Sequence, residues 1–241
     1  MGAIPARYGS IRLPGKPLLP IAGRPMIEHV YTRVAQARGL DRVVVLTDDE
    51  RIARVVESFG GEWEMTPADC ASGTDRIAWA ARHWDSGAVR AVINIQGDEP
   101  LIDPQGVSAV AAHLAAHPED PVVTLATPAA EEEMENPNAV KVVLAGDGAA
   151  LYFSRAPIPH RRQEGGFSPL KHLGIYGYQR EALLRLAALP PTPLERSESL
   201  EQLRALENGI PIRVLVVERG SFGVDTAADL ERVERMLSAE A

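Results

Sequence analysis

The chain has 241 residues, of which 45% are hydrophobic and 24% are charged. This supplies enough apolar material for the core of one large domain or two small ones, so a disordered chain is excluded. The formal net charge is −8, and an acidic chain is a poor partner for the phosphate backbone of DNA or RNA. The single cysteine, Cys70, excludes an intrachain disulfide and a multi-cysteine metal site, and it favours a reducing compartment.

Short β-branched runs alternate with amphipathic stretches along the chain. After a first strand that ends near Pro5, runs typical of largely buried strands lie at 43–46, 91–95, 122–126, 140–144 and 212–217. Between them, apolar residues recur at helical spacing over 26–37, 52–59, 77–84, 107–114, 183–187, 200–206 and 230–237. This alternation predicts an α/β fold, with a mostly parallel, Rossmann-like sheet that carries helices on both faces.

The middle of the chain breaks this alternation. Residues 151–154 and 173–178 are strand-like, and a loop rich in proline, glycine and charge lies between them at 157–169. We interpret 145–180 as an insertion on a single domain that spans 1–241. No apolar run approaches the ~20 residues that a helix needs to cross a bilayer, and the first residues lack the apolar segment of a signal peptide. We therefore expect a cytoplasmic protein without membrane contact.

The first loop after a predicted strand is rich in cations. Ligands of open parallel sheets bind beyond the carboxyl ends of the strands, and there the segment 5–18 carries Arg7, Arg12 and Lys16 among glycines and prolines. Glycines let backbone N–H groups approach an anion, and the cations supply charge, which suits a polyphosphate. The segment matches neither the dinucleotide-binding glycine motif nor the P-loop. An ordinary basic surface loop would have the same composition.

Two aspartates follow later strands. Asp98 lies in the segment 96–100, and Asp225 comes just after the last predicted strand. A carboxylate that faces a phosphate-binding loop commonly holds Mg²⁺, a hard cation that prefers oxygen ligands. Either aspartate alone is more typical of a turn or a helix N-cap. Together, opposite a cationic loop, they favour a metal–phosphate site.

Other polar segments suit a base or a sugar acid. The small polar residues at 71–76 could contact the edge of a base, or they could cap the helix that follows. The middle segment combines cations with hydroxyl groups, which a sugar acid needs for its carboxylate and its own hydroxyls. These residues are Arg155, Lys171, His172, Tyr176 and Tyr178. A lone histidine is more often structural, and Glu201 with Gln202 is typical of a solvated helix flank.

Taken in order, these motifs resemble those of the 3-deoxy-manno-octulosonate cytidylyltransferases (CMP-Kdo synthetases). The resemblance covers 5–18, 72–76, 96–100, 136–143, 150–159, 172–178, Glu198, 200–204 and 223–226. The runs most specific to this family are HLGIYGY at 172–178 and LEQLR at 200–204. Only four residues precede Pro5, so we expect a first strand that is short or lacks its beginning, and the loop 159–169 is shorter than in the family.

The resemblance implies a reaction and an assembly. The fold would be that of the nucleotidyltransferases, and the enzyme would be a cytidylyltransferase of class EC 2.7.7.38. It would convert CTP and the eight-carbon sugar acid Kdo into CMP-Kdo and pyrophosphate, for lipopolysaccharide synthesis. The implied cofactor is Mg²⁺. The implied assembly is a homodimer, in which 145–180 contributes sugar-site and dimer contacts.

The resemblance also assigns a role to individual residues. Those implied at the triphosphate are Arg7, Arg12 and Lys16. Those implied at the cytosine and ribose are Ser72, Gln96 and the backbone near Ala6. Asp98 and Asp225 would bind Mg²⁺ and, with Arg7 and Lys16, form the catalytic set. Those implied at Kdo are Arg155, His172, Tyr176, Glu201 and Gln202.

Two other functions stay open. The first is the same chemistry on a related sugar acid, such as 8-amino-Kdo or a nonulosonic acid, although the residues around His172 and Gln202 favour Kdo. The second is a nucleotide-binding protein without turnover. Asp98 and Asp225 speak against it, because a pure binder has less need of two metal-binding carboxylates.

Overall fold

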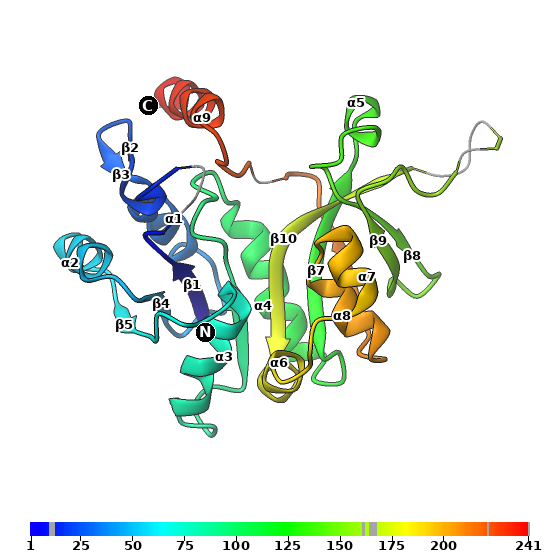
Figure 1. Cartoon of the computed structure of the whole chain (residues 1–241), viewed down its shortest axis with the longest axis horizontal. Helices are drawn as coiled ribbons and strands as arrows, with labels where there is room; N and C mark the ends of the chain where they lie inside the picture. Colours follow the sequence, from blue (N-terminus) through cyan, green and yellow to red (C-terminus); the bar gives the residue numbers. More distant parts are fainter. Residues whose placement is uncertain (10–12, 161, 164–167, 221, 241) are drawn as a thin grey trace.

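A central mixed β-sheet runs through the protein, shown in Figure 1 as a computed structural model that describes residues 1–9, 13–160, 162–163, 168–220 and 222–240. Over these residues the sheet has nine strands, most of which follow one another in a single path. From one edge to the other, the path is β11 (Ile212–Val216), β7 (Val122–Pro128), β10 (Leu170–Gln179), β6 (Ala91–Asn94), β1 (Gly2–Ala6), β4 (Val43–Thr47) and β5 (Trp63–Met65).

Most neighbours in this path are parallel, which confirms the predicted fold class. β1 pairs in parallel with β4 and with β6, and β11 pairs in parallel with β7. Only β10 runs against both of its neighbours on this path. Because β1, β4 and β6 are parallel, the loops that follow them meet at one edge of the sheet. This edge is where the candidate residues are expected.

Helices cover both faces of the sheet, as predicted. On one face, the apolar sides of α1 (Met26–Val34), α2 (Glu50–Ser58) and α4 (Pro104–Ala116) pack into one buried cluster. On the other face, a second cluster holds α3 (Gly73–His83), α6 (Arg180–Ala187) and α8 (Gln202–Glu207). The strands between these layers read as continuous apolar runs because both of their faces are buried.

The C-terminal helix α9 (Ala227–Glu240) packs away from the sheet, against the region that follows β1 (Figure 1). A third apolar cluster joins Val233 of α9 and Val224 to Ile21 and Met26. Ile21 belongs to β2 (Pro20–Ile21), which forms a small hairpin with β3 (Arg24–Pro25). This cluster holds the segment before α9 close to the loop after β1, and Asp225 lies in that segment.

The middle segment differs from the predicted insertion. β8 (Lys141–Leu144) and β9 (Ala150–Ser154) form an antiparallel hairpin that pairs with the first residues of β10. The rest of β10 lies in the middle of the main sheet, between β6 and β7. The second half of 145–180 is thus part of the central sheet. Figure 1 shows the hairpin at one end of the molecule and β5 with α2 at the other.

The elements absent from the sequence prediction are all short. They are β2, β3, β5, α5 (Glu131–Met134) and α7 (Pro193–Glu198). None is long enough to repeat an apolar period, which is the signal that the prediction relied on. Among the described residues, the structure contains no helix of the length and hydropathy needed to traverse a bilayer.

A close contact between β10 and α4 gives a test of this packing. A Cβ atom on Gly177 would lie 2.4 Å from Val110 Cγ1 and 2.6 Å from Leu114 Cδ1, and both of those side chains are buried. Gly177→Ala should therefore lower the free energy of unfolding by about 1–3 kcal/mol through overpacking. Urea unfolding followed by circular dichroism measures this change.

The matched control is Gly146→Ala, because a Cβ on this exposed glycine would meet nothing within 4 Å. Its free energy of unfolding should stay within about 0.5 kcal/mol of wild type. Equal unfolding midpoints for Gly177→Ala and wild type would show that β10 and α4 do not pack as described.

Candidate functional site

A cavity of 480 Å³ lies beyond the carboxyl ends of β1 and β6. It brings together every described residue that the resemblance assigned to the nucleotide and the metal. These are Ala6, Arg7, Lys16, Ser72, Gln96, Asp98 and Asp225. Arg12, the other residue implied at the triphosphate, lies outside the described residues. The cavity therefore gathers residues from segments more than two hundred positions apart in the chain.

The cavity forms where the end of β1 meets the loop after β6. A Cβ atom on Gly97 would approach the backbone oxygen of Pro5 to 3.0 Å, so a side chain at this position would push the loop away from β1. Ala6 and Arg7 both line the cavity, and Ala6 is buried whereas Arg7 is exposed. Gln96 is half-buried, and its amide lies 3.5 Å from Asn94 Oδ1.

Lys16 joins the two aspartates. It begins the short 3₁₀ helix η1 (Lys16–Leu18), and its side chain is only 12% exposed. Its Nζ donates to Asp98 Oδ2 at 2.7 Å, to Asp225 Oδ1 at 3.1 Å and to the backbone oxygen of Val224 at 2.6 Å. A single ammonium group thus bridges two carboxylates, one from the loop after β6 and one from the segment before α9, and offsets half of their charge.

This pair fits a divalent cation. Oxygens of both carboxylates converge on one position, and carboxylate oxygen is a preferred ligand of Mg²⁺. Among the described residues, no group of three or more acidic, histidine or cysteine side chains gathers into a metal site. Two carboxylates leave the remaining positions of an octahedral ion to phosphate oxygens and water, which is the usual arrangement of Mg²⁺ with nucleotides.

The start of α3 forms another wall of the cavity. Ser72 is the N-cap of this helix: its Oγ accepts from the backbone N–H of Asp75 at 3.1 Å and donates to Asp75 Oδ2 at 3.0 Å. The capping alternative for this segment is therefore correct, and the same residue also lines the cavity. Cap and cavity wall are compatible because the first N–H groups of a helix point out of its end.

Arg76 lines the cavity too, although the sequence analysis did not single it out. Its side chain is buried, and the guanidinium donates to Asp48 Oδ2 at 3.0 Å and to Thr66 Oγ1. These contacts fix the loop after β4 against α3. Cys70 is a further lining residue, and burial raises the pKa of its thiol. Arg76 could have been found from the sequence, because it belongs to the 72–76 motif and lies one helical turn after Ser72.

Two of the residues implied at the sugar acid, His172 and Tyr176, flank an irregularity in β10. The register of β10 against β7 shifts between Leu173 and Tyr176. Thr124 of β7 bridges the shift, since its hydroxyl donates to the backbone oxygen of Ile175 at 2.7 Å. A Cβ on Gly174, inside the shift, would lie 3.4 Å from Glu99 Oε1 and 3.9 Å from Gln96 Cγ. The irregular part of β10 thus borders the loop that carries Gln96 and Asp98.

His172 and Tyr176 lie together on β10, and their rings are 5.2 Å apart. The His172 ring also packs at 5.1 Å on Phe153, and its Nε2 lies 2.9 Å from Thr124 Oγ1. Burial lowers the pKa of His172 to about 3, so the imidazole is neutral at pH 7. Since the single Thr124 proton goes to Ile175, Nε2–H of His172 is the donor in its contact with Thr124, and Nδ1 is left as an acceptor.

The Tyr176 hydroxyl is buried and has no hydrogen-bond partner among the described residues. Burial raises the pKa of this phenol well above its ordinary value, so it stays protonated. A buried hydroxyl without a partner costs free energy, and a bound ligand could recover that cost by accepting a hydrogen bond from it.

Arg155 anchors the end of α7 near the hairpin. Its guanidinium donates to the backbone oxygens of Glu198 at 2.7 Å, Pro137 at 2.9 Å and Ser199 at 3.3 Å. Guanidinium has five N–H donors, so two are left for a ligand. Beneath it, the buried ammonium of Lys141 donates to the backbone oxygen of Arg155 at 2.6 Å, and burial lowers the pKa of Lys141. Arg155, which is implied at the sugar acid, therefore also has a structural role: it holds the end of α7 against the segment at Pro137.

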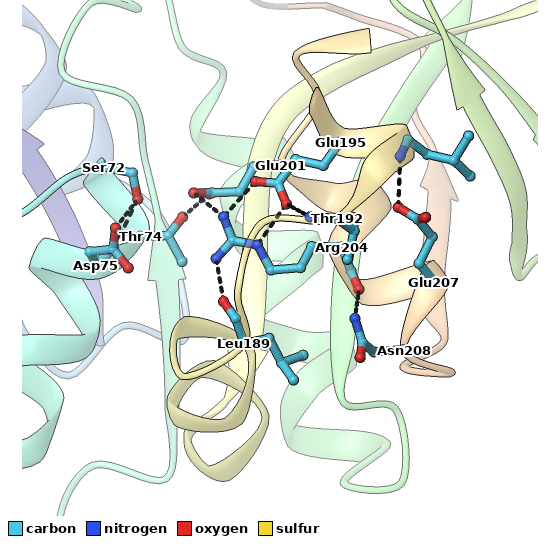
Figure 2. Close-up of polar contacts among 11 residues, drawn as sticks. Ser72, Thr74, Asp75, Leu189, Thr192, Glu195, Glu201, Arg204, Glu207 and Asn208 are labelled. Atoms are coloured by element: carbon cyan, nitrogen blue, oxygen red, sulfur yellow. Dashed lines mark hydrogen bonds and ion pairs between the residues drawn. The ribbon is translucent and has the colours of Figure 1, made fainter. Parts of the chain in front are cut away.

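Glu201 and Gln202 lie at the start of α8, where Gln202 is buried and Glu201 is a third exposed. Glu201 accepts a hydrogen bond from Thr74 of α3 and lies 3.7 Å from Arg204 Nη2 (Figure 2). Gln202 is thus not part of a solvated helix flank. Through Thr74, the start of α8 contacts the helix whose first residues line the cavity.

The chain is similar to known proteins over nearly its whole length. A family model described as Cytidylyltransferase matches residues 1–214. The chain is 53% identical to a 3-deoxy-manno-octulosonate cytidylyltransferase of Syntrophotalea carbinolica, across 97% of this chain and 96% of the relative. It is 52% identical to a protein of the same name from Anaeromyxobacter dehalogenans strain 2CP-C, across 99% of this chain and 97% of the relative.

A solved structure has the same fold. It is a CMP:2-keto-3-deoxy-manno-octonic acid synthetase complexed with CTP, which matches with a TM-score of 0.95 and 45% identity. The match covers 100% of this chain and 98% of that chain.

The neutral His172 predicts a particular dependence of stability on pH. An unfolded histidine takes up a proton near pH 6.5, whereas the folded one stays neutral down to a pKa of about 3. Its contribution to the free energy of unfolding is therefore complete above pH 6.5 and falls by up to about 1.4 kcal/mol per pH unit below it. In His172→Gln this fall disappears, so wild type should lose its advantage over the variant between pH 7 and pH 4.5.

Urea unfolding at three pH values across this range checks the prediction. His160→Gln, at an exposed histidine, is the matched control and should follow wild type throughout. An advantage of wild type over His172→Gln that stays constant with pH would mean that His172 is not shielded from protons.

Proposed function

This chain belongs to the family of 3-deoxy-manno-octulosonate cytidylyltransferases, and we propose that it transfers CMP from CTP to Kdo with release of pyrophosphate. One observation carries the proposal. One cavity at the carboxyl edge of the parallel strands is lined by two cationic residues, Arg7 and Lys16, and Lys16 bridges the carboxylates of Asp98 and Asp225. A triphosphate with a divalent cation is the ligand whose charges match this set.

At the nucleotide end, Arg7 and Lys16 would neutralise the triphosphate, together with Arg12 of the same loop. Ser72 and Gln96 would contact the cytosine and ribose, along with the backbone at Ala6. Ser72 retains acceptor capacity beside its capping bonds, and Gln96 has both an amide donor and an amide acceptor. Their support is their common place on the wall of the cavity.

At the metal, Asp98 and Asp225 would hold Mg²⁺. Bound there, the ion would neutralise charge on the phosphates and lower the pKa of the attacking hydroxyl. Lys16 has the position between the two carboxylates in the structure, so its ammonium group must leave the pair when a cation is bound. The released ammonium would then pair with the triphosphate. Lys16 would thus pair with the carboxylates before the metal binds and with the nucleotide afterwards.

At the sugar acid, Arg155 would supply the charge that matches the carboxylate of Kdo. The neutral His172 cannot do so, but its Nδ1 can accept a hydrogen bond from a sugar hydroxyl. Tyr176 would donate a hydrogen bond from its unpartnered hydroxyl, while Glu201 and Gln202 would bind further hydroxyls of the sugar. His172 and Tyr176 flank the irregular part of β10, which borders the loop of Gln96, and Glu201 contacts Thr74 of α3.

The reaction follows from this placement. The anomeric hydroxyl of Kdo would attack the α-phosphorus of CTP in line with the departing pyrophosphate. A bond forms between the sugar oxygen and phosphorus, the bond from phosphorus to the bridging oxygen breaks, and the hydroxyl proton is released. The side chains contribute position and charge neutralisation, which are the main sources of rate in phosphoryl and nucleotidyl transfer.

The proposed product would supply an activated sugar acid for lipopolysaccharide synthesis in the cytoplasm. We also propose that the protein acts as a homodimer. The hairpin of β8 and β9 would contribute to the contact, since Leu151 there is 62% exposed and Val216, at the end of the edge strand β11, is 54% exposed.

Pyrophosphate release by the purified protein tests the function. Release should require CTP, Kdo and Mg²⁺, and it should stop when any one of them is omitted. Asp98→Asn should reduce kcat by about a hundredfold or more, because it removes half of the carboxylate pair. Asp41→Asn, at an exposed aspartate on the opposite edge of the sheet, should keep wild-type kcat.

Each other outcome has a definite meaning. Release with 8-amino-Kdo or a nonulosonic acid but not with Kdo would replace the acceptor. Nucleotide binding without release for every sugar acid would favour a protein without turnover. Normal activity of Asp98→Asn would remove this residue from the metal site.

A further inference from the structure

A line of buried polar contacts crosses from α3 to α8, beside the cavity. Figure 2 shows Glu201 between Thr74 on one side and Arg204 on the other. Thr74 is 3% exposed, and its hydroxyl donates to Glu201 Oε2 across 127 positions of sequence. The proposed reaction assigns a role to Glu201 alone among these residues, so the function of the line is unexplained by it.

We propose that Thr74 is a positioning residue: it fixes the carboxylate of Glu201 at the border between the nucleotide cavity and the sugar-acid residues. The proposal rests on the function above, in which Glu201 binds a hydroxyl of the sugar acid. It adds a residue that touches no substrate and acts through Glu201.

The first support is the direction of the hydrogen bond at Thr74. A threonine hydroxyl has one proton, and this one goes to Glu201 Oε2. Thr74 is buried, so bulk water does not compete for this proton. The Thr74 hydroxyl therefore has a fixed orientation toward Glu201.

The second support is the fixation of the other carboxylate oxygen. Glu201 Oε1 lies 3.7 Å from Arg204 Nη2. Arg204 is itself held: its Nε donates to Glu195 Oε2 at 2.8 Å, its Nη2 donates to Glu195 Oε1, and Nη1 reaches the backbone oxygen of Leu189 at 3.4 Å. Arg204 and Glu195 have side chains only 8% and 11% exposed. With a partner on each oxygen, the carboxylate of Glu201 cannot rotate freely.

The third support is where this fixed carboxylate lies. Thr74 follows Ser72 and Gly73, which line the nucleotide cavity, so α3 contacts the cavity and Glu201 within three residues. The side chain of Glu201 is 33% exposed and remains open to a ligand. Tyr176, another residue implied at the sugar acid, has a buried hydroxyl without a partner among the described residues. Burial and, to a smaller extent, the charges of Tyr178 and Glu201 raise the pKa of this phenol. Glu201 thus offers a held acceptor, and Tyr176 offers a donor, to the same proposed ligand.

Removal of the Thr74 hydroxyl at constant shape tests the proposal. Thr74→Val should raise the KM for Kdo about tenfold, the effect of losing one hydrogen bond to a charged group. The KM for CTP and kcat should each change less than about twofold, because the cavity wall and the reacting groups remain. Thr74→Ser, which restores the hydroxyl, should return the KM for Kdo to within about twofold of wild type.

A double-mutant cycle with Glu201→Gln separates positioning from general packing. If Thr74 acts through Glu201, the double variant should have a KM for Kdo no higher than the worse single variant. Thr127→Val is the matched control, since this buried threonine of β7 makes only a long hydrogen bond, to the backbone oxygen of Glu218 at 3.5 Å. It should leave both KM values unchanged.

Three results would overturn the proposal: an equal rise in both KM values, failure of Thr74→Ser to restore the KM for Kdo, or additive effects in the cycle. If Thr74→Val does not fold, Thr74→Ala takes its place in each comparison. If wild type releases no pyrophosphate with CTP and Kdo, the proposed function fails by itself. The hydrogen bond from Thr74 to Glu201 is then tested by amide hydrogen exchange. Residues 199–206 should exchange faster in Thr74→Val than in Thr74→Ser, and equal exchange would reject the positioning role.

Discussion

The contact between Lys16 and the two aspartates is the interaction on which the cavity depends. Asp98 and Asp225 are far apart in sequence, and each belongs to a segment that could lie elsewhere on the surface. Their charges would repel one another without a cation between them. Lys16 supplies that cation at hydrogen-bonding distance and also bonds to the backbone at Val224. It thereby adds side-chain contacts to the backbone hydrogen bond from Val224 N–H to the Asp98 oxygen at 2.9 Å, which also joins the loop after β6 to the segment before α9.

The rest of the structure brings residues from distant segments to this point. The parallel strands β1, β4 and β6 end at one edge, and the apolar cluster of α9 holds Asp225 there. β10 runs in the opposite direction, and its irregular part borders the loop that carries Gln96 and Asp98. The line through Thr74, Glu201 and Arg204 joins α8 to α3. Both halves of the sheet thus contribute residues beside the cavity.

The sequence predicted what depends on local pattern. Buried β-branched runs gave β4, β6 and β7, and helical spacing gave the main helices, because burial on both faces leaves a strong apolar period. The central place of β10 could not be read from 173–178, since strand order depends on pairing between distant residues. The same holds for Thr74 and Arg76, whose local pattern indicates only a helix start. The sequence left His172 open between a structural and a binding role, and the structure shows a neutral ring with one acceptor nitrogen.

The central claim is that the pair of Asp98 and Asp225 holds a divalent cation and that Lys16 stands in for it beforehand. Electron paramagnetic resonance of Mn²⁺ measures this directly, because the six-line signal of the free ion disappears on binding. The account predicts weak binding to wild type alone, tight binding once CTP is added, and binding without nucleotide in Lys16→Met. Asp98→Asn and Asp225→Asn should lose the site. Equal Mn²⁺ binding by wild type, Lys16→Met and both aspartate variants would contradict the account.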